Sequence, residues 1–152
     1  MKKLLYAALL FISISAWANT PPEVNEKILK AFSETFIEAD DVKWSEYENV
    51  CQATFKVDEI QVRAMYDEEG NLLQTTRHYS EKHLPSYILV KLNNKYKGKE
   101  VFGVTEISGG NEISYHVVLR DKKRWYIVES DVYGNLTQTQ SFRNAEPPQE
   151  GK

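Results

Sequence analysis

The chain has 152 residues, and 19 lysines and arginines against 22 aspartates and glutamates give it a net charge of −3. A mildly acidic chain without a basic stripe argues against nucleic acid as a partner. It also lacks a polybasic patch that would bind anionic lipid. Cys51 is the single cysteine, so no intrachain disulfide can form.

Residues 1–18 have the pattern of a secretory signal peptide. Lys2 and Lys3 form a positive start, residues 4–14 are an apolar run, and a small-x-small cleavage site ends at Ala18. The apolar run is too short to span a bilayer. We therefore predict cleavage after Ala18, a periplasmic or secreted location, and no membrane insertion of the mature chain. The alternative is a buried N-terminal helix. The 134 residues left after removing 18 from 152 suit one domain.

The first half of the mature chain reads as one helix followed by strands. Residues 23–37 follow two prolines and place apolar side chains at Val24, Ile28 and Phe32, which is the spacing of an amphipathic helix. Alternating apolar and polar residues then predict strands that open near 42–44 and continue at 51–57, 60–66 and 72–79.

The second half repeats this order. A helix is predicted at about 86–96, and strands are predicted near 101–108, 112–120, 124–132 and 135–142. Residues 144–152 are polar and proline-rich, and we expect a disordered tail there.

A sequence repeat links the two halves. Residues 66–75 return as residues 130–139 at an offset of 64 (134 − 70). The same offset aligns the apolar positions of the helix and of one strand. We therefore predict a domain over residues 19–143 made of two repeats, about 20–79 and 84–143. The predicted fold class is α+β: each repeat is a helix plus about four antiparallel strands, and both helices pack on one face of the sheet.

The motifs of this pattern resemble those of the PepSY-like, beta-lactamase-inhibitor-protein-like (BLIP-like) family of exported bacterial proteins. They are Val42-Lys43-Trp44 after the first helix, the hairpin of Tyr66-Asp67 and Gly70-Asn71-Leu72, Leu84-Pro85, and the second hairpin Gly134-Asn135-Leu136. The resemblance covers nearly the whole mature chain. It implies a tandem helix-plus-sheet fold and suggests binding or inhibition through the sheet face. It carries over no catalytic residue, because turns and core positions specify a fold rather than a chemistry.

The residues give no support to catalysis or metal binding. Cys51 alternates with Ala53 and Phe55, so we expect it on the core face, opposite to the direction in which His116 points. A catalytic cysteine would need a histidine beside it. The histidines are too scattered for a metal site, and Asp67 fits a hairpin turn better than a calcium loop. No catalytic residue, metal or cofactor is predicted.

The free face of the sheet is the more interesting place. By strand register it should carry an exposed tryptophan together with arginines and apolar residues, which is the composition of a protein-binding hot spot. The candidate partner-binding residues are Trp125, Ile127, Arg63, Met65, His116, Val118 and Arg120. In the alternatives, the register slips by one residue and buries Trp125, or the tail or a second subunit covers the face.

These observations lead to three functional hypotheses. The leading one is an exported, non-enzymatic protein that binds another exported protein or a peptide through the open sheet face, and its more specific form is an inhibitor of a peptidase or another hydrolase. The second is a periplasmic small-ligand carrier or envelope-stress protein with a site in the groove between helices and sheet. The third is an enzyme built around Cys51, which would need a readily reactive thiol. The sequence names neither the partner nor the oligomeric state.

Overall fold

A computed structural model describes residues 23–144 of the chain. The predicted signal peptide and residues 145–152 of the predicted tail lie outside this range. The elements follow one another as α1 (Glu26–Thr35), β1 (Asp40–Tyr47), β2 (Val50–Val57), β3 (Ile60–Tyr66), β4 (Leu72–Tyr79), the 3-10 turn η1 (Glu81–His83), α2 (Ser86–Lys95), β5 (Glu100–Gly109), β6 (Glu112–Arg120), β7 (Arg124–Asp131) and β8 (Leu136–Arg143).

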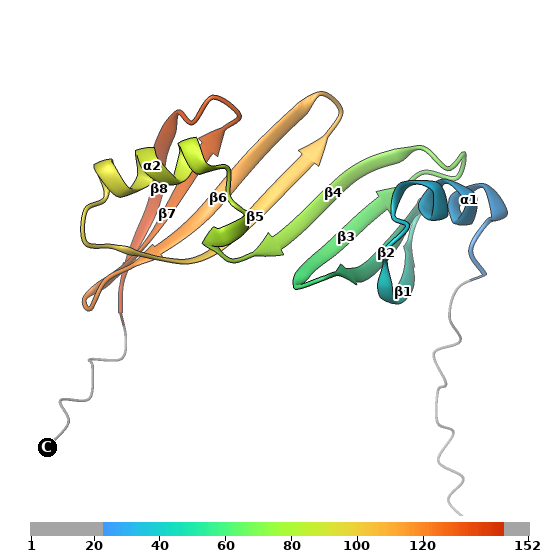
Figure 1. Cartoon of the computed structure of the whole chain (residues 1–152). Helices are drawn as coiled ribbons and strands as arrows, with labels where there is room; N and C mark the ends of the chain where they lie inside the picture. Colours follow the sequence, from blue (N-terminus) through green and yellow to red (C-terminus); the bar gives the residue numbers. More distant parts are fainter. Residues whose placement is uncertain (1–22, 145–152) are drawn as a thin grey trace, which may run out of the picture.

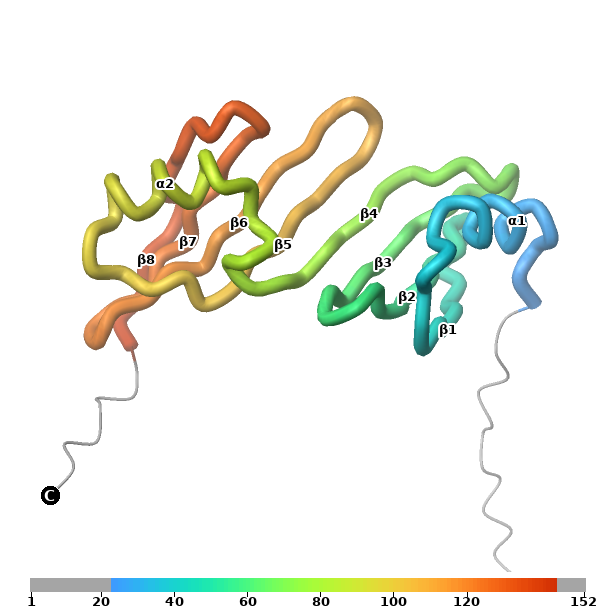
Figure 2. Tube along the Cα trace, viewed as in Figure 1, coloured from blue at the N-terminus to red at the C-terminus, as the bar shows by residue number. Residues whose placement is uncertain are grey.

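The strands of the described chain form one antiparallel sheet in the order β1 to β8, so each strand pairs with its neighbours in sequence (Figure 1). α1 lies beside the end of the sheet that contains β1 to β3, and α2 lies beside the end that contains β6 to β8 (Figure 2). The two ends of the described chain therefore lie at opposite ends of the sheet.

One face of the sheet, here called the core face, carries the buried side chains. Phe55 pairs with Val62 in β2 and β3, and Val117 pairs with Val128 in β6 and β7; all four are at most 4% exposed. Each helix adds two buried residues to this core, Ile28 and Phe32 from α1 and Ile88 and Leu92 from α2. The opposite face, here called the open face, carries the alternate residues of each strand, as the two-residue period of a strand requires.

The predicted fold class is wrong. The prediction was two units of a helix plus about four antiparallel strands, with both helices packed on one face of the sheet. The structure is instead a single eight-stranded antiparallel sheet with two short helices, and 54% of the described residues lie in strands. The individual strands are present where the alternation predicted them. The class fails because β4 pairs directly with β5, from Gln74↔Gly109 to Tyr79↔Val104, so the sheet does not divide into two units.

The seam between β4 and β5 is polar on the core face. Thr75 and Ser108 bring their hydroxyl oxygens within 3.3 Å. The guanidinium Nη1 of Arg77 lies 3.1 Å from a carboxylate oxygen of Glu106, and the Tyr79 hydroxyl donates to the other oxygen at 2.6 Å. Burial, followed by this hydrogen bond, raises the pKa of Tyr79 above its ordinary value of 10. The seam thus joins two apolar regions through polar pairs and the backbone ladder.

Two hairpin turns use the same hydrogen-bond network. Asp67 accepts hydrogen bonds from the backbone N–H groups of Glu69 and Asn71, at 3.1 and 2.8 Å, and from the Asn71 side chain at 2.8 Å. Asp131 does the same in the hairpin between β7 and β8. These bonds lower the pKa of both carboxyl groups, with the Asn71 side chain the main cause for Asp67. The acid of each motif therefore serves the turn itself.

Gly70 is required where the first of these hairpins meets α1. Its φ is +86°, and a Cβ built there would lie 2.9 Å from the carbonyl oxygen of Lys27. Only glycine combines this backbone conformation with so close an approach. The hairpin and α1 are joined further by Asn25, whose amide donates to the Glu68 carbonyl at 3.1 Å.

Candidate binding surface on the open face

Five of the seven predicted site residues lie together on β6 and β7. Arg120 pairs with Trp125, Val118 pairs with Ile127, and His116 pairs with Glu129. The neighbours Tyr126 and Val128 belong to the core. Trp125 and Ile127 therefore point to the open face, and each is only partly buried there.

The indole of Trp125 belongs to an aromatic cluster. The Phe102 ring stands at 88° to it with the ring centroids 4.8 Å apart, which is an edge-to-face contact. The Arg120 guanidinium lies 4.9 Å from the Phe102 centroid and 5.8 Å from that of Trp125. Phe142 of β8 pairs with Trp125 on the other side. Phe102, Arg120, Trp125 and Phe142 are called the aromatic corner below.

The aromatic corner is solvent-accessible and held in place. Phe102 is 57% exposed and Phe142 is 50% exposed. Arg120 donates two hydrogen bonds to the Glu100 carboxylate, both 3.1 Å long, which fixes the plane of the guanidinium over the rings. Paired in this way, Arg120 lowers the pKa of Glu100. Two half-exposed phenylalanines beside a fixed arginine form an apolar contact area with a charged rim.

A polar network behind the corner fixes the turn between β6 and β7. Asp121 accepts hydrogen bonds from the backbone N–H groups of Lys123 and Arg124, both at 2.8 Å. Its other oxygen accepts from Lys99 Nζ at 2.8 Å and from the Tyr126 hydroxyl at 2.9 Å. The hydrogen bond from Lys99 is the main cause that lowers the pKa of Asp121. The turn beside the aromatic corner therefore has little conformational freedom.

The other two predicted residues, Arg63 and Met65, are not brought to this corner. They lie on β3, where Arg63 pairs with Thr76 and Met65 with Gln74. The strands β4 and β5 separate them from β6, a distance of about 14 Å for three strand spacings. They share the open face with Trp125 but not its contacts.

His116 is placed one row further along the open face. Its Nδ1 lies 3.6 Å from a carboxylate oxygen of Glu129, and it pairs across the strands with Thr105. The Thr105 hydroxyl lies 3.0 Å from Nδ1 of His78. This row is polar and adjoins the apolar residues Val118 and Ile127.

Sequence reasoning missed Phe102 and Phe142. Phe102 occupies a bulge, because the pairing of β5 with β6 shifts between Val101 and Gly103. A second bulge shifts the pairing of β7 with β8 between Ile127 and Val128. Simple alternation cannot place a residue beyond a bulge. One signal for Phe142 was available in the sequence: it lies near the end of the strand that follows the strand of Trp125, and in a hairpin the end of the second strand pairs with the start of the first.

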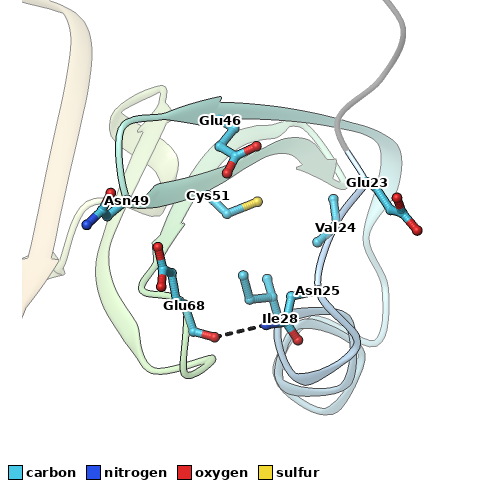
Figure 3. Close-up of a pocket in the computed structure, with 8 residues that line it drawn as sticks. All are labelled: Glu23, Val24, Asn25, Ile28, Glu46, Asn49, Cys51 and Glu68. Carbon is cyan, nitrogen blue, oxygen red and sulfur yellow. Dashed lines mark hydrogen bonds between the residues drawn. The ribbon is translucent and has the colours of Figure 1, made fainter.

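A hollow of about 200 Å³ lies where α1 approaches the sheet (Figure 3). Val24, Ile28 and Cys51 line it together with Glu46 and Glu68. Cys51 is 7% exposed, so its predicted place in the core is confirmed. Burial, and then the charge of Glu46, raise the pKa of the Cys51 thiol. This environment disfavours the reactive thiolate.

Residues 23–144 contain neither a candidate metal site nor a candidate membrane-spanning helix. No group of three or more histidine, cysteine or acidic side chains in that range could hold a metal ion. No helix in the described part of the chain is long and apolar enough to cross a membrane.

The fold has known counterparts among solved structures. A BLIP-like protein from Bacteroides fragilis matches with a TM-score of 0.65 at 20% identity, over 85% of this chain and 92% of that one. A DUF2874 family protein from Bacteroides ovatus matches with a TM-score of 0.60 at 15% identity, over 82% and 89%. A candidate periplasmic protein from Bacteroides eggerthii matches with a TM-score of 0.60 at 10% identity, over 80% and 90%.

These likenesses define the class of the fold. The chain has a BLIP-like fold, as the resemblance in the sequence implied, whereas the PepSY-like part of that resemblance is not shown. At these identities the likeness concerns the fold alone. No protein-family model matches the chain, and no curated protein does.

Proposed function

We propose that this is an exported binding protein that contacts another exported protein or a peptide through the open face, centred on the aromatic corner. The observation that carries the proposal is the half-exposed pair Phe102 and Phe142 on either side of Trp125, with Arg120 held over the rings. Aromatic residues and arginine are the side chains most often found at binding hot spots.

The fold neighbours support the general class of function that we propose. One of them is called BLIP-like and another is described as a candidate periplasmic protein, which agrees with a binding or inhibitory role outside the cytoplasm. Inhibition of an exported peptidase or other hydrolase is the specific form that we propose to test. Cleavage of the signal peptide predicted at residues 1–18 would bring the protein to the same compartment as such a target.

The hollow between α1 and the sheet does not support the carrier hypothesis. The hollow between α1 and the sheet holds about 200 Å³ and is lined by several carboxylates. Sites for small ligands usually measure about 300–1,000 Å³ and are mostly apolar. An acid-lined hollow below that size does not fit such a ligand.

The test compares three forms of the purified protein: wild type, Trp125→Ala and Tyr133→Ala. Tyr133 is 76% exposed on the hairpin between β7 and β8 and serves as the matched control for loss of a surface aromatic. Proteins captured from the exported fraction are purified and their affinity is measured directly. A partner that binds wild type and Tyr133→Ala equally, but Trp125→Ala at least about tenfold more weakly, supports the proposal.

Trp125→Ala should cost about 1–2 kcal/mol of folding free energy, because it removes an edge-to-face pair and some burial. The protein should remain folded by circular dichroism. Phe142→Ser provides a second variant of the corner with less burial to lose. Partners that bind wild type and both corner variants equally would contradict the proposal.

A further inference from the structure

The sheet ends in two edge strands that differ in their protection. β1 carries Asp40, Asp41, Lys43 and Glu46, and its pairing with β2 shifts between Asp40 and Lys43. Charges and irregular pairing are the usual devices that prevent another strand from adding to an edge. The edge at β1 is therefore blocked.

The edge at β8 is open over four residues. Within residues 23–144, β8 pairs only with β7, and the bulge opposite Ile127 leaves Thr139 without a partner in that ladder. From Gln140 to Arg143 the pairing is regular again. This stretch contains a single charge, and an exposed edge strand presents unpaired backbone N–H and C=O groups to solvent.

The two faces of this stretch have different chemistry. Phe142 points to the open face, beside Trp125. Arg143 points to the core face, directly opposite Arg124. Like charges directly opposite each other destabilise a pair of strands. No acidic side chain within residues 23–144 forms an ion pair with either arginine.

Further positive charge lies along the same edge. Lys95 of α2 donates to the Leu136 carbonyl at 2.8 Å, so its charge stands over the start of β8 beside a neutral acceptor. Lys123 lies beside the other end of β8, where its carbonyl accepts a hydrogen bond from the Asn144 backbone N–H at 2.8 Å. Positive charge on one face and an aromatic ring on the other define the chemistry of a complementary strand.

We propose that Gln140–Arg143 accepts an extended segment of another polypeptide as a ninth, added strand. Its backbone pairs with the free edge of β8, its apolar side chains cover Phe142, and its acidic side chains meet Arg143 and Arg124. The occupant is thus a segment that alternates acidic with apolar residues. Strand addition of this kind takes affinity from main-chain hydrogen bonds and specificity from alternate side chains.

Two other occupants fit less well. A second copy of the chain pairing β8 with β8 would bring Arg124, Arg143 and Lys123 of both copies to one side of the interface, where their like charges repel. The residues that follow Arg143 in the same chain include Pro147 and Pro148, which have no backbone N–H to donate to a ladder. The proposal goes beyond the proposed function, because it concerns the strand edge rather than the open face, although Phe142 belongs to both.

The experiment uses a fluorescein-labelled, end-capped peptide of eight residues that alternates glutamate with valine and phenylalanine. Binding to the purified protein is measured by fluorescence anisotropy. Two further peptides carry N-methyl groups on all glutamates or on all apolar residues. In a strand, every second residue directs its N–H toward the same neighbour. Only one of the two methylated peptides should therefore lose binding, by about tenfold or more.

Charge dependence is tested on both partners. A peptide with lysine in place of glutamate should bind at least about tenfold more weakly, and Arg143→Glu should weaken the acidic peptide by a similar factor. Lys43→Glu makes the same charge change on the blocked edge strand β1 and should leave binding unchanged. Circular dichroism verifies that both variants are folded.

Three results would overturn the proposal. Equal binding of the two methylated peptides would exclude backbone pairing, and if Trp125→Ala then abolished binding, the peptide would lie on the open face and the proposed function would stand alone. An unchanged affinity of Arg143→Glu would exclude the charge complementarity. Self-association in sedimentation velocity that Arg143→Glu abolishes would assign the edge to a second copy. Conversely, peptide binding with the expected methylation pattern, without any partner sensitive to Trp125→Ala, would support the edge site and reject the open face.

Discussion

The buried hydroxyl of Tyr66 provides a sharp test of the core. Tyr66 is 0% exposed, and its hydroxyl has no hydrogen-bond partner among the described residues. A buried polar group without a partner costs about 1–3 kcal/mol relative to water. Tyr66→Phe removes that hydroxyl and leaves the ring in place. We therefore expect the free energy of unfolding to rise, by about 1 kcal/mol once the loss of a small contact volume is allowed for.

Tyr79→Phe is the matched control, and it should change stability in the opposite direction. Tyr79 is also buried, but its hydroxyl donates to the Glu106 carboxylate at 2.6 Å. A hydrogen bond to a charged group contributes about 1.5–3 kcal/mol. The same chemical deletion therefore stabilises at one position and destabilises at the other.

Urea unfolding followed by tryptophan fluorescence measures both effects. A shift of the midpoint with an unchanged slope reports a change in stability alone. If Tyr66→Phe lowers the free energy of unfolding, or if both variants shift in the same direction, the reasoning from hydroxyl partners is refuted.

Alkaline pH gives a second measurement on the same residue. Burial raises the pKa of Tyr66 from 10 to about 12. Between these values the unfolded chain loses the phenol proton while the folded chain keeps it, so the stability present below pH 10 falls as the pH rises toward 12. Tyr66→Phe should remove this part of the alkaline dependence.

Two further predictions concern turns. The pKa of Asp121 is lowered in the folded state, so its contribution to stability is present above the ordinary value of 3.8 and is lost as the pH falls below it. In thermal melts between pH 2 and 6, Asp121→Asn should therefore lose less stability on acidification than wild type does. Gly70→Ala should lower the free energy of unfolding by more than about 2 kcal/mol, from left-handed strain plus contact with the Lys27 carbonyl. Its control, Gly98→Ala, has a φ of +75° with no atom within 4 Å, so it should cost only the strain, about 1 kcal/mol. Equal losses for the two glycine variants in urea unfolding would contradict the contact.

The sequence located the strands but not the way in which they assemble. Alternation marks Ala53, Phe55 and Val117 because each strand has one buried face, and that signal is local. The pairing of Arg77 with Glu106 joins residues from strands separated by a turn and a helix, and nothing in their local sequence indicates it. The error in fold class follows from this difference, since the β4–β5 seam alone decides whether there is one sheet or two units.

The candidate surface was likewise predictable where the signal is local and not where it depends on how the strands pair. Alternation was enough to assign Trp125 and Ile127 to one face of β7. The neighbours Phe102 and Phe142 come from strands that enter the corner through bulges, where the two-residue period is interrupted. The charged rim formed by Arg120 and Glu100 depends on the same pairing of strand ends.

The strand order has a consequence for how the molecule is assembled. Because β1 to β8 follow one another in the sheet as they do in the chain, every strand after β1 finds its first partner already made when the chain emerges N-terminus first. The longest connection between two paired strands is the one from β4 to β5, which contains η1 and α2. Pairings of neighbours in sequence keep the loop-closure cost low and favour rapid folding for a sheet. Growth by successive addition leaves one unpaired side on the first strand, β1, and one on the last strand, β8, and in this direction of growth the unpaired side of β8 is the last to form.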